Sequence, residues 1–145
     1  MKILFFLLLK FLLISHNINS TDVYSIVSFF THTSKKIQTN NGYEFSISEA
    51  LGNWQDNKGN YGKSKIIFYV EEFSNTTLIK GLAELTDQNN QTVWFIPERE
   101  TNQEAGVGKI RVIDSSKKYT FLKNQKCLYA INYLDNRSFL KIKCN

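Results

Sequence analysis

The sequence has few of the residues and motifs on which common catalytic sites depend. It contains two histidines, and its single Gly-x-Gly triplet, Gly106-Val-Gly108, does not continue into a phosphate-binding or dinucleotide-binding motif. His16 lies in a segment that we expect to be removed, and His32 lies in a Thr/Ser/Lys-rich segment that we interpret as a solvent-exposed loop. With one histidine left, a zinc site would also need free cysteines, and we expect the two cysteines to pair with each other; we therefore expect no metal and no cofactor. These absences weigh against an enzyme without excluding one.

Carboxylates are the least excluded catalytic groups. Glu98, Glu100 and Glu104 flank Arg99, and Asp56 lies further upstream in a predicted turn. At the mouth of a barrel, such a carboxylate could act as a general base or hold a cation. The alternative is a solvated loop whose exposed ion pairs contribute little to stability.

Helical periodicity and proline are also scarce. After residue 20 no convincing stretch has apolar residues at helical spacing, and Pro97 is the single proline. Short runs rich in β-branched and aromatic residues are instead separated by clusters of Asn, Asp, Gly and Ser, which is typical of an all-β domain. We predict strands at 23–30, 43–54, 61–73, 77–86, 92–98 and 106–114, followed by the two strands of a C-terminal hairpin.

The strand sequence favours an eight-stranded antiparallel up-and-down β-barrel, because closure removes the exposed edges of a sheet. A two-sheet β-sandwich is the alternative. Segments 31–42, 99–105 and 115–125 are predicted to be loops or irregular connections. Gly52 is expected to mark a bend or bulge, and Pro97, which has no amide donor, is expected at a strand end or an edge.

The chain has only two cysteines, and the predicted C-terminal hairpin places them opposite each other. A two-residue turn at Asp135-Asn136 sets Leu134 opposite Arg137, and stepping outward sets Cys127 opposite Cys144 in a non-hydrogen-bonded pair, where Cα atoms approach most closely. We therefore predict a disulfide on the core-facing side of the hairpin. The alternative is two free thiols in a reducing compartment.

The N-terminus has the organisation of a secretory signal peptide. Lys2 precedes an apolar run at 3–14 that Lys10 interrupts, and a polar segment follows at 15–20. We predict a signal peptide at 1–20 and a single domain at 21–145, secreted or periplasmic and without membrane insertion after cleavage; an uncleaved anchor is the alternative. Removing Lys2 and Lys10 lowers the formal net charge from +5 to +3. So small an excess does not predict a nucleic-acid partner.

Two segments resemble the eight-stranded barrels of the dirigent and allene oxide cyclase type. They are the 54–62 turn, Trp-Gln-Asp-Asn-Lys-Gly-Asn-Tyr-Gly, and the strand Gly-Val-Gly-Lys-Ile-Arg-Val-Ile at 106–113 with the loop after it. Residues 114–117 stand where that group has a glycine-rich turn, and no match to its catalytic residues is found. The resemblance implies a barrel with an open mouth and an oligomer, and it carries over no site.

Aromatic residues near predicted strand ends suggest a ligand pocket. An eight-stranded barrel is just wide enough to be filled by side chains or to hold one small ligand. The candidate pocket residues are Trp54, Tyr61, Tyr69, Trp94, Arg99 and Tyr129. Aromatic walls with a few polar groups would suit a small apolar ligand. The alternative, that these rings fill the core, is the simpler interpretation.

Three Asn-x-Ser/Thr triplets, at Asn75, Asn90 and Asn136, fall at predicted turns and are acceptor sites for glycans in a eukaryotic secretory route. Taken together, these features predict an exported, non-enzymatic barrel that binds a small apolar ligand or a protein partner. One alternative is a dirigent- or cyclase-like barrel isomerase, by analogy of fold alone. Another is a secreted inhibitor or host-interaction protein that uses the segment at 99–106.

Overall fold

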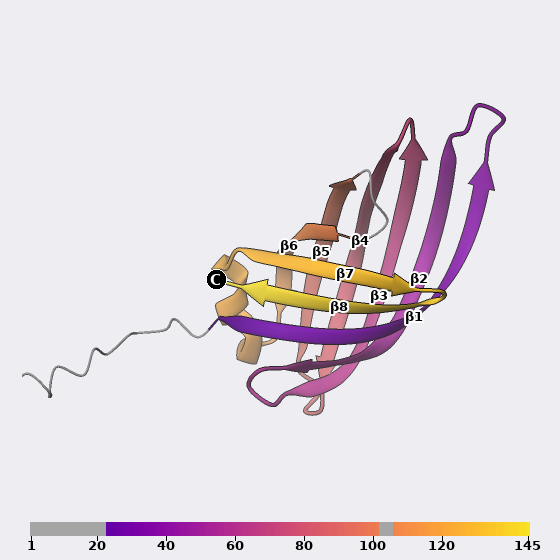
Figure 1. The fold of residues 1–145 in the computed structure, drawn as a ribbon. Helices are drawn as coiled ribbons and strands as arrows, with labels where there is room; N and C mark the ends of the chain where they lie inside the picture. Colours follow the sequence, from indigo (N-terminus) through magenta and orange to yellow (C-terminus); the bar gives the residue numbers. More distant parts are fainter. Residues whose placement is uncertain (1–22, 102–105) are drawn as a thin grey trace, which may run out of the picture.

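Eight antiparallel strands form a closed barrel in the order of the sequence, which confirms the predicted fold class (Figure 1). The computed structural model describes residues 23–101 and 106–145; the predicted signal peptide and Glu104 lie outside the described residues. The strands are β1 (Tyr24–Gln38), β2 (Glu44–Asp56), β3 (Tyr61–Phe73), β4 (Thr76–Asp87), β5 (Thr92–Thr101), β6 (Gly106–Ser115), β7 (Cys127–Leu134) and β8 (Arg137–Cys144).

Strict alternation of side chains creates the core. In β4, Ile79, Ala83 and Leu85 point inward and are buried, as the sequence predicted. The same alternation in β1 buries Tyr24, Ile26, Ser28 and Phe30, so the buried face of this strand is the one opposite Val27 and Phe29. The apolar core fills the half of the barrel in which β1 begins and β8 ends.

The C-terminal hairpin has the predicted register. Leu134 is opposite Arg137 and Cys127 is opposite Cys144, and the two cysteines form a disulfide with a Cα–Cα distance of 4.1 Å. In the turn, Asp135 has a φ of 55°, a conformation that Asp tolerates better than most residues. Both cysteines are buried, so the bridge faces the core as expected.

The predicted loop at 31–42 is wrong over 31–38, because β1 continues to Gln38, and right over 39–42, which lie in the β1–β2 turn. Residues 26–38 pair without interruption with 44–56 of β2, whereas the pairing of β1 with β8 ends at Thr31. The outer half of β1 therefore has one neighbouring strand and stands beyond the β7–β8 hairpin (Figure 1). Residues 33–38 are exposed, which suits their largely polar composition, and backbone pairing with β2 holds them as a strand despite their modest β-propensity.

The expectation that residue 99 begins a loop is also wrong, since β5 extends to Thr101. Pro97 lies inside this strand, opposite Ile110 of β6, and not at an end or an edge. Pro97 has no amide N–H to donate, and the β4–β5 pairing is interrupted at this point. Gly81 and Leu82 of β4 have no paired residue on β5, and the pairing resumes at Ala83 in the same register. A central strand accommodates this proline at the cost of a local interruption of pairing.

Gly52 is not a bulge, because β1–β2 pairing runs through it unbroken. A Cβ at this position would lie 1.9 Å from the Phe29 carbonyl oxygen, so the glycine permits a close approach of two backbones. The register shift in the barrel occurs instead between Trp94 and Phe95 of β5. It inserts Ile113 of β6 as an extra residue opposite them.

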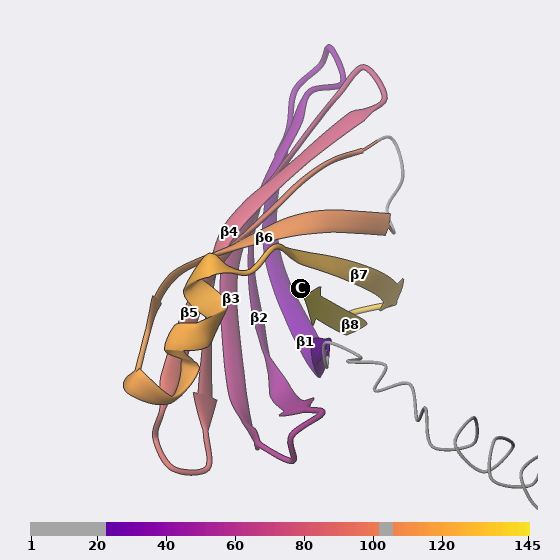
Figure 2. The same ribbon diagram turned by 90° about the vertical axis from the view of Figure 1, so that its left-hand side faces the viewer.

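The segment at 115–125, predicted to be irregular, contains the 3-10 helix η1 (Lys117–Asn124). Tyr119 and Leu122 of this helix are almost completely buried. The helix lies at the end of the barrel away from the tip of the β1–β2 hairpin (Figure 2). It covers the apolar half of the interior, and we call this end of the molecule the covered end.

Replacing Cys127 and Cys144 together by alanine should lower the free energy of unfolding by about 3 kcal/mol, because the bridge closes a loop of 17 residues in the unfolded chain. Equilibrium urea unfolding of the oxidised wild type and the double variant measures this difference. Reduced wild-type protein should match the variant. Identical midpoints for all three proteins would show that the bridge does not stabilise the barrel.

Candidate functional site

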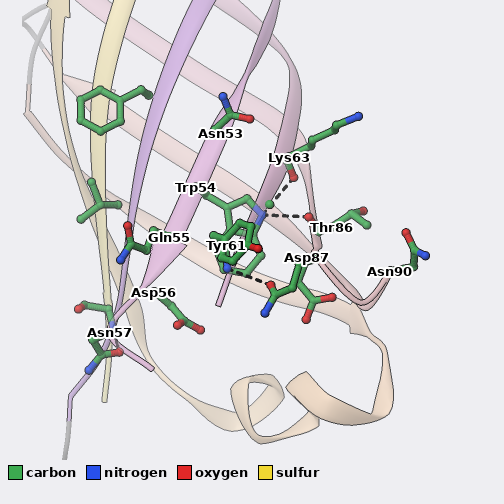
Figure 3. A pocket seen from close by; sticks show the side chains of 15 residues that line it. Asn53, Trp54, Gln55, Asp56, Asn57, Tyr61, Lys63, Thr86, Asp87 and Asn90 are labelled. Atoms are coloured by element: carbon green, nitrogen blue, oxygen red, sulfur yellow. Dashed lines mark hydrogen bonds between the residues drawn. The ribbon is translucent and has the colours of Figure 1, made fainter. Parts of the chain in front are cut away.

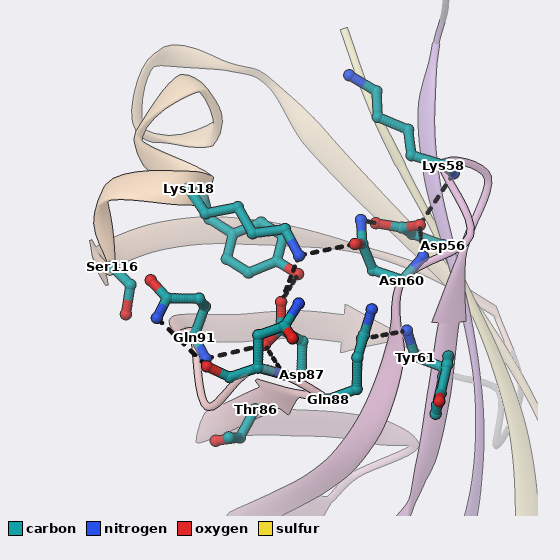
Figure 4. A network of polar contacts seen from close by, with 12 residues as sticks. Asp56, Lys58, Asn60, Tyr61, Thr86, Asp87, Gln88, Gln91, Ser116 and Lys118 are labelled. Carbon is teal, nitrogen blue, oxygen red and sulfur yellow. Dashed lines mark hydrogen bonds and ion pairs between the residues drawn. The ribbon is translucent and has the colours of Figure 1, made fainter.

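Two buried aspartates organise the covered end and have matching surroundings (Figure 4). Asp56 ends β2 and Asp87 ends β4, and each accepts backbone N–H groups two and four residues ahead, so that each carboxylate holds its own hairpin turn. For Asp56 the donors are the amides of Lys58 at 2.9 Å and Asn60 at 2.8 Å. For Asp87 they are the amides of residues 89 and 91, at 2.8 and 2.9 Å. The short Asp-centred turn is therefore used twice.

Each aspartate is also tied to a buried tyrosine. The Tyr24 hydroxyl donates to Asp56 at 2.8 Å, and the Tyr119 hydroxyl donates to Asp87 at 2.8 Å. Lys118 donates both to Asp87, at 2.5 Å, and to the side-chain oxygen of Asn60, at 2.7 Å, which joins the two turns. Tyr24 belongs to the first strand and Tyr119 to η1, so this network fixes the helix over the barrel.

The titration of these groups agrees with a structural role. Burial by itself would raise the pKa of Asp87, but the hydrogen bonds from Lys118, Gln91, Tyr119 and Asn89 outweigh it and hold the pKa at about 2. Burial and the adjacent carboxylates raise the pKa of the Tyr24 and Tyr119 hydroxyls, which stay protonated. Asp56, a candidate general base in the sequence, accepts four hydrogen bonds and is committed to holding its turn.

The opposite end of the barrel contains a cavity of about 290 Å³, which we call the mouth pocket. It is built from side chains of β1 to β5 and β7 and from the β7–β8 turn. Arg99 lies on its wall with 4 % of its surface exposed, on the inner face of β5, and the mouth pocket therefore contains a nearly buried cation. Two exposed carboxylates, Glu72 and Asp135, are at its rim. The complete lining is His32, Ser34, Ser46, Ser48, Phe68, Val70, Glu72, Thr77, Ile79, Arg99, Tyr133 and Asp135.

His32 is a wall residue of the mouth pocket and not the solvated loop residue that we predicted. Its Nε2 atom is 2.6 Å from the Ser138 hydroxyl, and its ring contacts those of Phe30, Phe68 and Tyr133. Burial lowers the pKa of the imidazole, so the ring is neutral at neutral pH. Continuing the alternation of Ile26, Ser28 and Phe30 by one step places residue 32 inside, and this is the signal that sequence reasoning missed.

The mouth pocket brings together a cation, a neutral imidazole and several hydroxyls. The Ser34 and Ser48 hydroxyls are hydrogen-bonded to each other at 2.6 Å, and Ser48 is buried. Arg99 supplies planar N–H donors that suit a carboxylate, whereas His32 can accept or transfer a proton. Phe68, Val70 and Ile79 supply apolar wall. Such a set of groups can bind a small molecule that has one anionic group and an apolar body.

The six residues proposed as an aromatic pocket do not share one cavity. Trp54 and Tyr129 are buried on the inner face, and Arg99 lines the mouth pocket. Tyr129 is close enough to Arg99 for the cation to oppose the effect of burial on the pKa of its hydroxyl, which is raised to about 12. Trp54 and Tyr129 therefore fill the core, which was the alternative to the pocket prediction.

The other three rings are on the outer wall. Tyr61 is exposed, Tyr69 stacks on Phe45 with ring centroids 6.0 Å apart, and the Trp94 indole N–H donates to Glu84 at 2.9 Å. On β3 and β5, these three residues alternate with inner-face residues such as Phe68 and Arg99 and therefore point outward.

The predicted surface features fall on exposed turns and on the outer wall. Asn75, Asn90 and Asn136 are all exposed at turns, so their acceptor nitrogens can be reached by a modifying enzyme. Glu98 forms an ion pair with Lys80 at 3.1 Å on the outer face, and Glu100 is exposed.

Within the described residues, no three His, Cys, Asp or Glu side chains group together in a way that could hold a metal ion. No helix among these residues is both long and apolar enough to cross a bilayer.

No protein-family model and no curated protein matches the chain. Its fold is similar to that of a β-barrel-like protein, ABAYE2633, from Acinetobacter baumannii AYE, with a TM-score of 0.69, 10 % identity and coverage of 84 % of this chain and 94 % of that one. It is also similar to a protein of unknown function from Clostridium acetobutylicum ATCC 824, with a TM-score of 0.66, 13 % identity and coverage of 85 % of this chain and 94 % of that one. For the conserved protein RPA1785 of unknown function from Rhodopseudomonas palustris, the TM-score is 0.62, the identity is 7 %, and the coverage is 85 % of this chain and 94 % of that one. At these identities the similarity shows the fold alone.

Asp87 should control the acid stability of the barrel. Its pKa near 2 in the folded protein is below the ordinary 3.8, so its stabilising contribution is complete above about pH 4 and is lost as the pH falls through 2. Asp87→Asn should lower the free energy of unfolding at pH 7 by about 2 kcal/mol and flatten the acid dependence. Urea unfolding between pH 2 and 7 measures both effects. Asp114→Asn, at an exposed ion pair with Lys123, is the control and should change little.

His32 should titrate below its ordinary pKa of about 6.5. In a protein that lacks residues 1–20 it is the only histidine, so NMR of the imidazole C–H signals follows one group. Because the pKa of His32 is lowered in the folded barrel, the unfolded chain binds a proton at this imidazole more tightly than the folded barrel does. The stability that His32 contributes is therefore complete above about pH 6.5 and falls as the pH decreases below it. A midpoint at or above 6.5 would show that the imidazole is not in the half-buried site described.

Proposed function

We propose that this protein is an exported β-barrel that binds a small amphipathic carboxylate in its mouth pocket. The observation that carries the proposal is the position of Arg99, a permanently charged group almost wholly removed from solvent on the wall of an open cavity. A guanidinium on the wall of a cavity gives that wall a positive electrostatic potential, which suits a bound anion. A guanidinium also offers two parallel donors to a carboxylate, which sets the orientation of the ligand.

The remaining lining specifies the rest of the ligand. Phe68, Val70 and Ile79 would contact an apolar body, and His32 with Ser34 and Ser48 could exchange hydrogen bonds with one further polar group. A cavity of about 290 Å³ is at the lower limit of common ligand sites, so the ligand is a small molecule and not a long acyl chain. The mixed lining supports an amphipathic ligand in place of the purely apolar one that the sequence suggested.

The disulfide supports the export part of the proposal. Protein disulfides form and persist mainly in secreted and periplasmic compartments, and this one is buried in the core of the hairpin. The predicted signal peptide at 1–20 is consistent with the same route. Mass spectrometry of the protein purified from its source would report cleavage and the state of the thiols together, and an intact N-terminus with reduced thiols would contradict export.

The ligand proposal predicts that Arg99→Gln abolishes binding of carboxylates, whereas Arg111→Gln, at an exposed arginine on the next strand, does not. NMR chemical-shift titration of the wild type with a panel of small aromatic and aliphatic carboxylates, each paired with its primary amide, measures this. Acids should perturb the signals of His32 and Phe68 and bind roughly tenfold or more tightly than the amides, because only the acid pairs with the guanidinium. Equal binding of acid and amide, or unchanged binding in Arg99→Gln, would contradict the proposal.

A further inference from the structure

A second concave surface lies on the outside of the barrel and is larger than the mouth pocket. It has a volume of about 1020 Å³ and is bordered by the outward-facing residues of β1, β2 and β3 and by the β4–β5 turn (Figure 3). We call it the outer groove. It shares no lining residue with the mouth pocket, and none of the groups assigned to ligand binding above contributes to it.

A glycine in the lining lets two strands lie close together. A Cβ on Gly62 would lie 2.0 Å from the Thr86 carbonyl oxygen, so β3 approaches β4 more closely here than a side chain would allow. The buried Trp54 indole lines the groove from beneath. Its N–H is directed at the Lys63 carbonyl at 3.1 Å and the Thr86 carbonyl at 3.3 Å. These two hydrogen bonds hold the indole in place.

Two aromatic rings are unusually exposed on the lining. Phe29 has 63 % and Tyr61 has 60 % of its surface accessible to solvent, and Phe29 is supported from the β8 side by Phe139, with ring centroids 5.0 Å apart. The Tyr61 main chain is held by Gln88, whose side-chain oxygen accepts the Tyr61 amide at 3.0 Å. Both rings thus belong to fixed strands and present faces that could stack on an apolar ligand surface.

The polar part of the lining consists mainly of carboxamides. Asn53, Gln55 and Asn90 make no side-chain hydrogen bond to any part of the chain that the structure describes, and Figure 3 shows all three drawn around the groove. Each offers two donors and an acceptor. Lys63 is the only cationic side chain of the lining, and the two carboxylates there, Asp56 and Asp87, are buried and already hold their turns. A ligand of the outer groove therefore meets little accessible charge.

We propose that the outer groove binds a neutral oligosaccharide. The apolar C–H face of a sugar ring packs on an aromatic ring, and its equatorial hydroxyls are both donors and acceptors, which is the pairing that carboxamides satisfy. Phe29 and Tyr61 supply the stacking surfaces, whereas Asn53 and Gln55 supply the hydrogen bonds. A volume of about 1020 Å³ accommodates more than one sugar ring. A charged glycan or an acidic peptide would find no matching cation besides Lys63.

The experiment uses the chain without residues 1–20, made in bacteria so that Asn90, which lines the groove and begins an Asn-x-Thr triplet, carries no glycan. Calorimetric and NMR titrations with short neutral glucan, xylan, mannan and chitin oligomers should show binding of at least one of them, with shifts at Phe29, Tyr61 and Gln55. Tyr61→Ala should weaken that binding roughly tenfold, and Tyr61→Phe, which keeps the ring, should retain most of it.

Matched variants make the outcome decisive. Phe73→Ala removes a ring of similar exposure, 52 % against 60 % for Tyr61, from the same strand outside the groove and should leave binding unchanged. Arg99→Gln should also leave it unchanged, so the outer groove and the mouth pocket fail or succeed independently. Absence of binding to every oligomer by a folded, disulfide-bonded wild type would overturn the proposal. Oligosaccharide binding that Tyr61→Ala does not weaken would also overturn it. So would a peptide from a library that binds in the outer groove when no oligosaccharide does.

Discussion

The pairing of β1 with β8 is the constraint on which the rest of the structure depends. It joins the first and last strands into a ring in which the backbone of every strand has a neighbour on both sides over part of its length. Without that ladder the inner faces would form one side of an open sheet and not the wall of a cavity. The disulfide strengthens the same place, because Cys144 pairs both with Cys127 and with Tyr24 at the beginning of β1.

Closure also makes the two halves of the interior chemically different. Where β1 pairs with two strands, its inner residues are Tyr24, Ile26 and Phe30, and the space is filled with apolar side chains beneath η1. Where β1 passes beyond β8, its inner residues are His32 and Ser34, and the space is an open cavity. The transition from core to pocket thus occurs within one strand. It follows from the different lengths of the β1–β2 and β7–β8 hairpins.

Much of the fold could be read from the sequence, because strand alternation and turn residues are local signals. The C-terminal hairpin, the limits of β3 and the inner face of β4 all followed from period-two patterns between turns. The outer half of β1 could not be found in this way, since polar residues that pair with one neighbour in solvent look like a loop. That error hid His32, and the similar error at Arg99 assigned a buried wall residue to a charged loop.

The candidate site was harder to predict than the fold. Aromatic composition suggested a pocket, but which face a ring occupies depends on the parity of its strand, and Tyr61, Tyr69 and Trp94 have the outward parity. The order of the strands also has a consequence for how the molecule forms. Because β8 follows the other seven strands in the chain and is the partner of β1, the ring cannot close before β8 has been synthesised. Until then, β1 and the strand made most recently each have an unpaired edge.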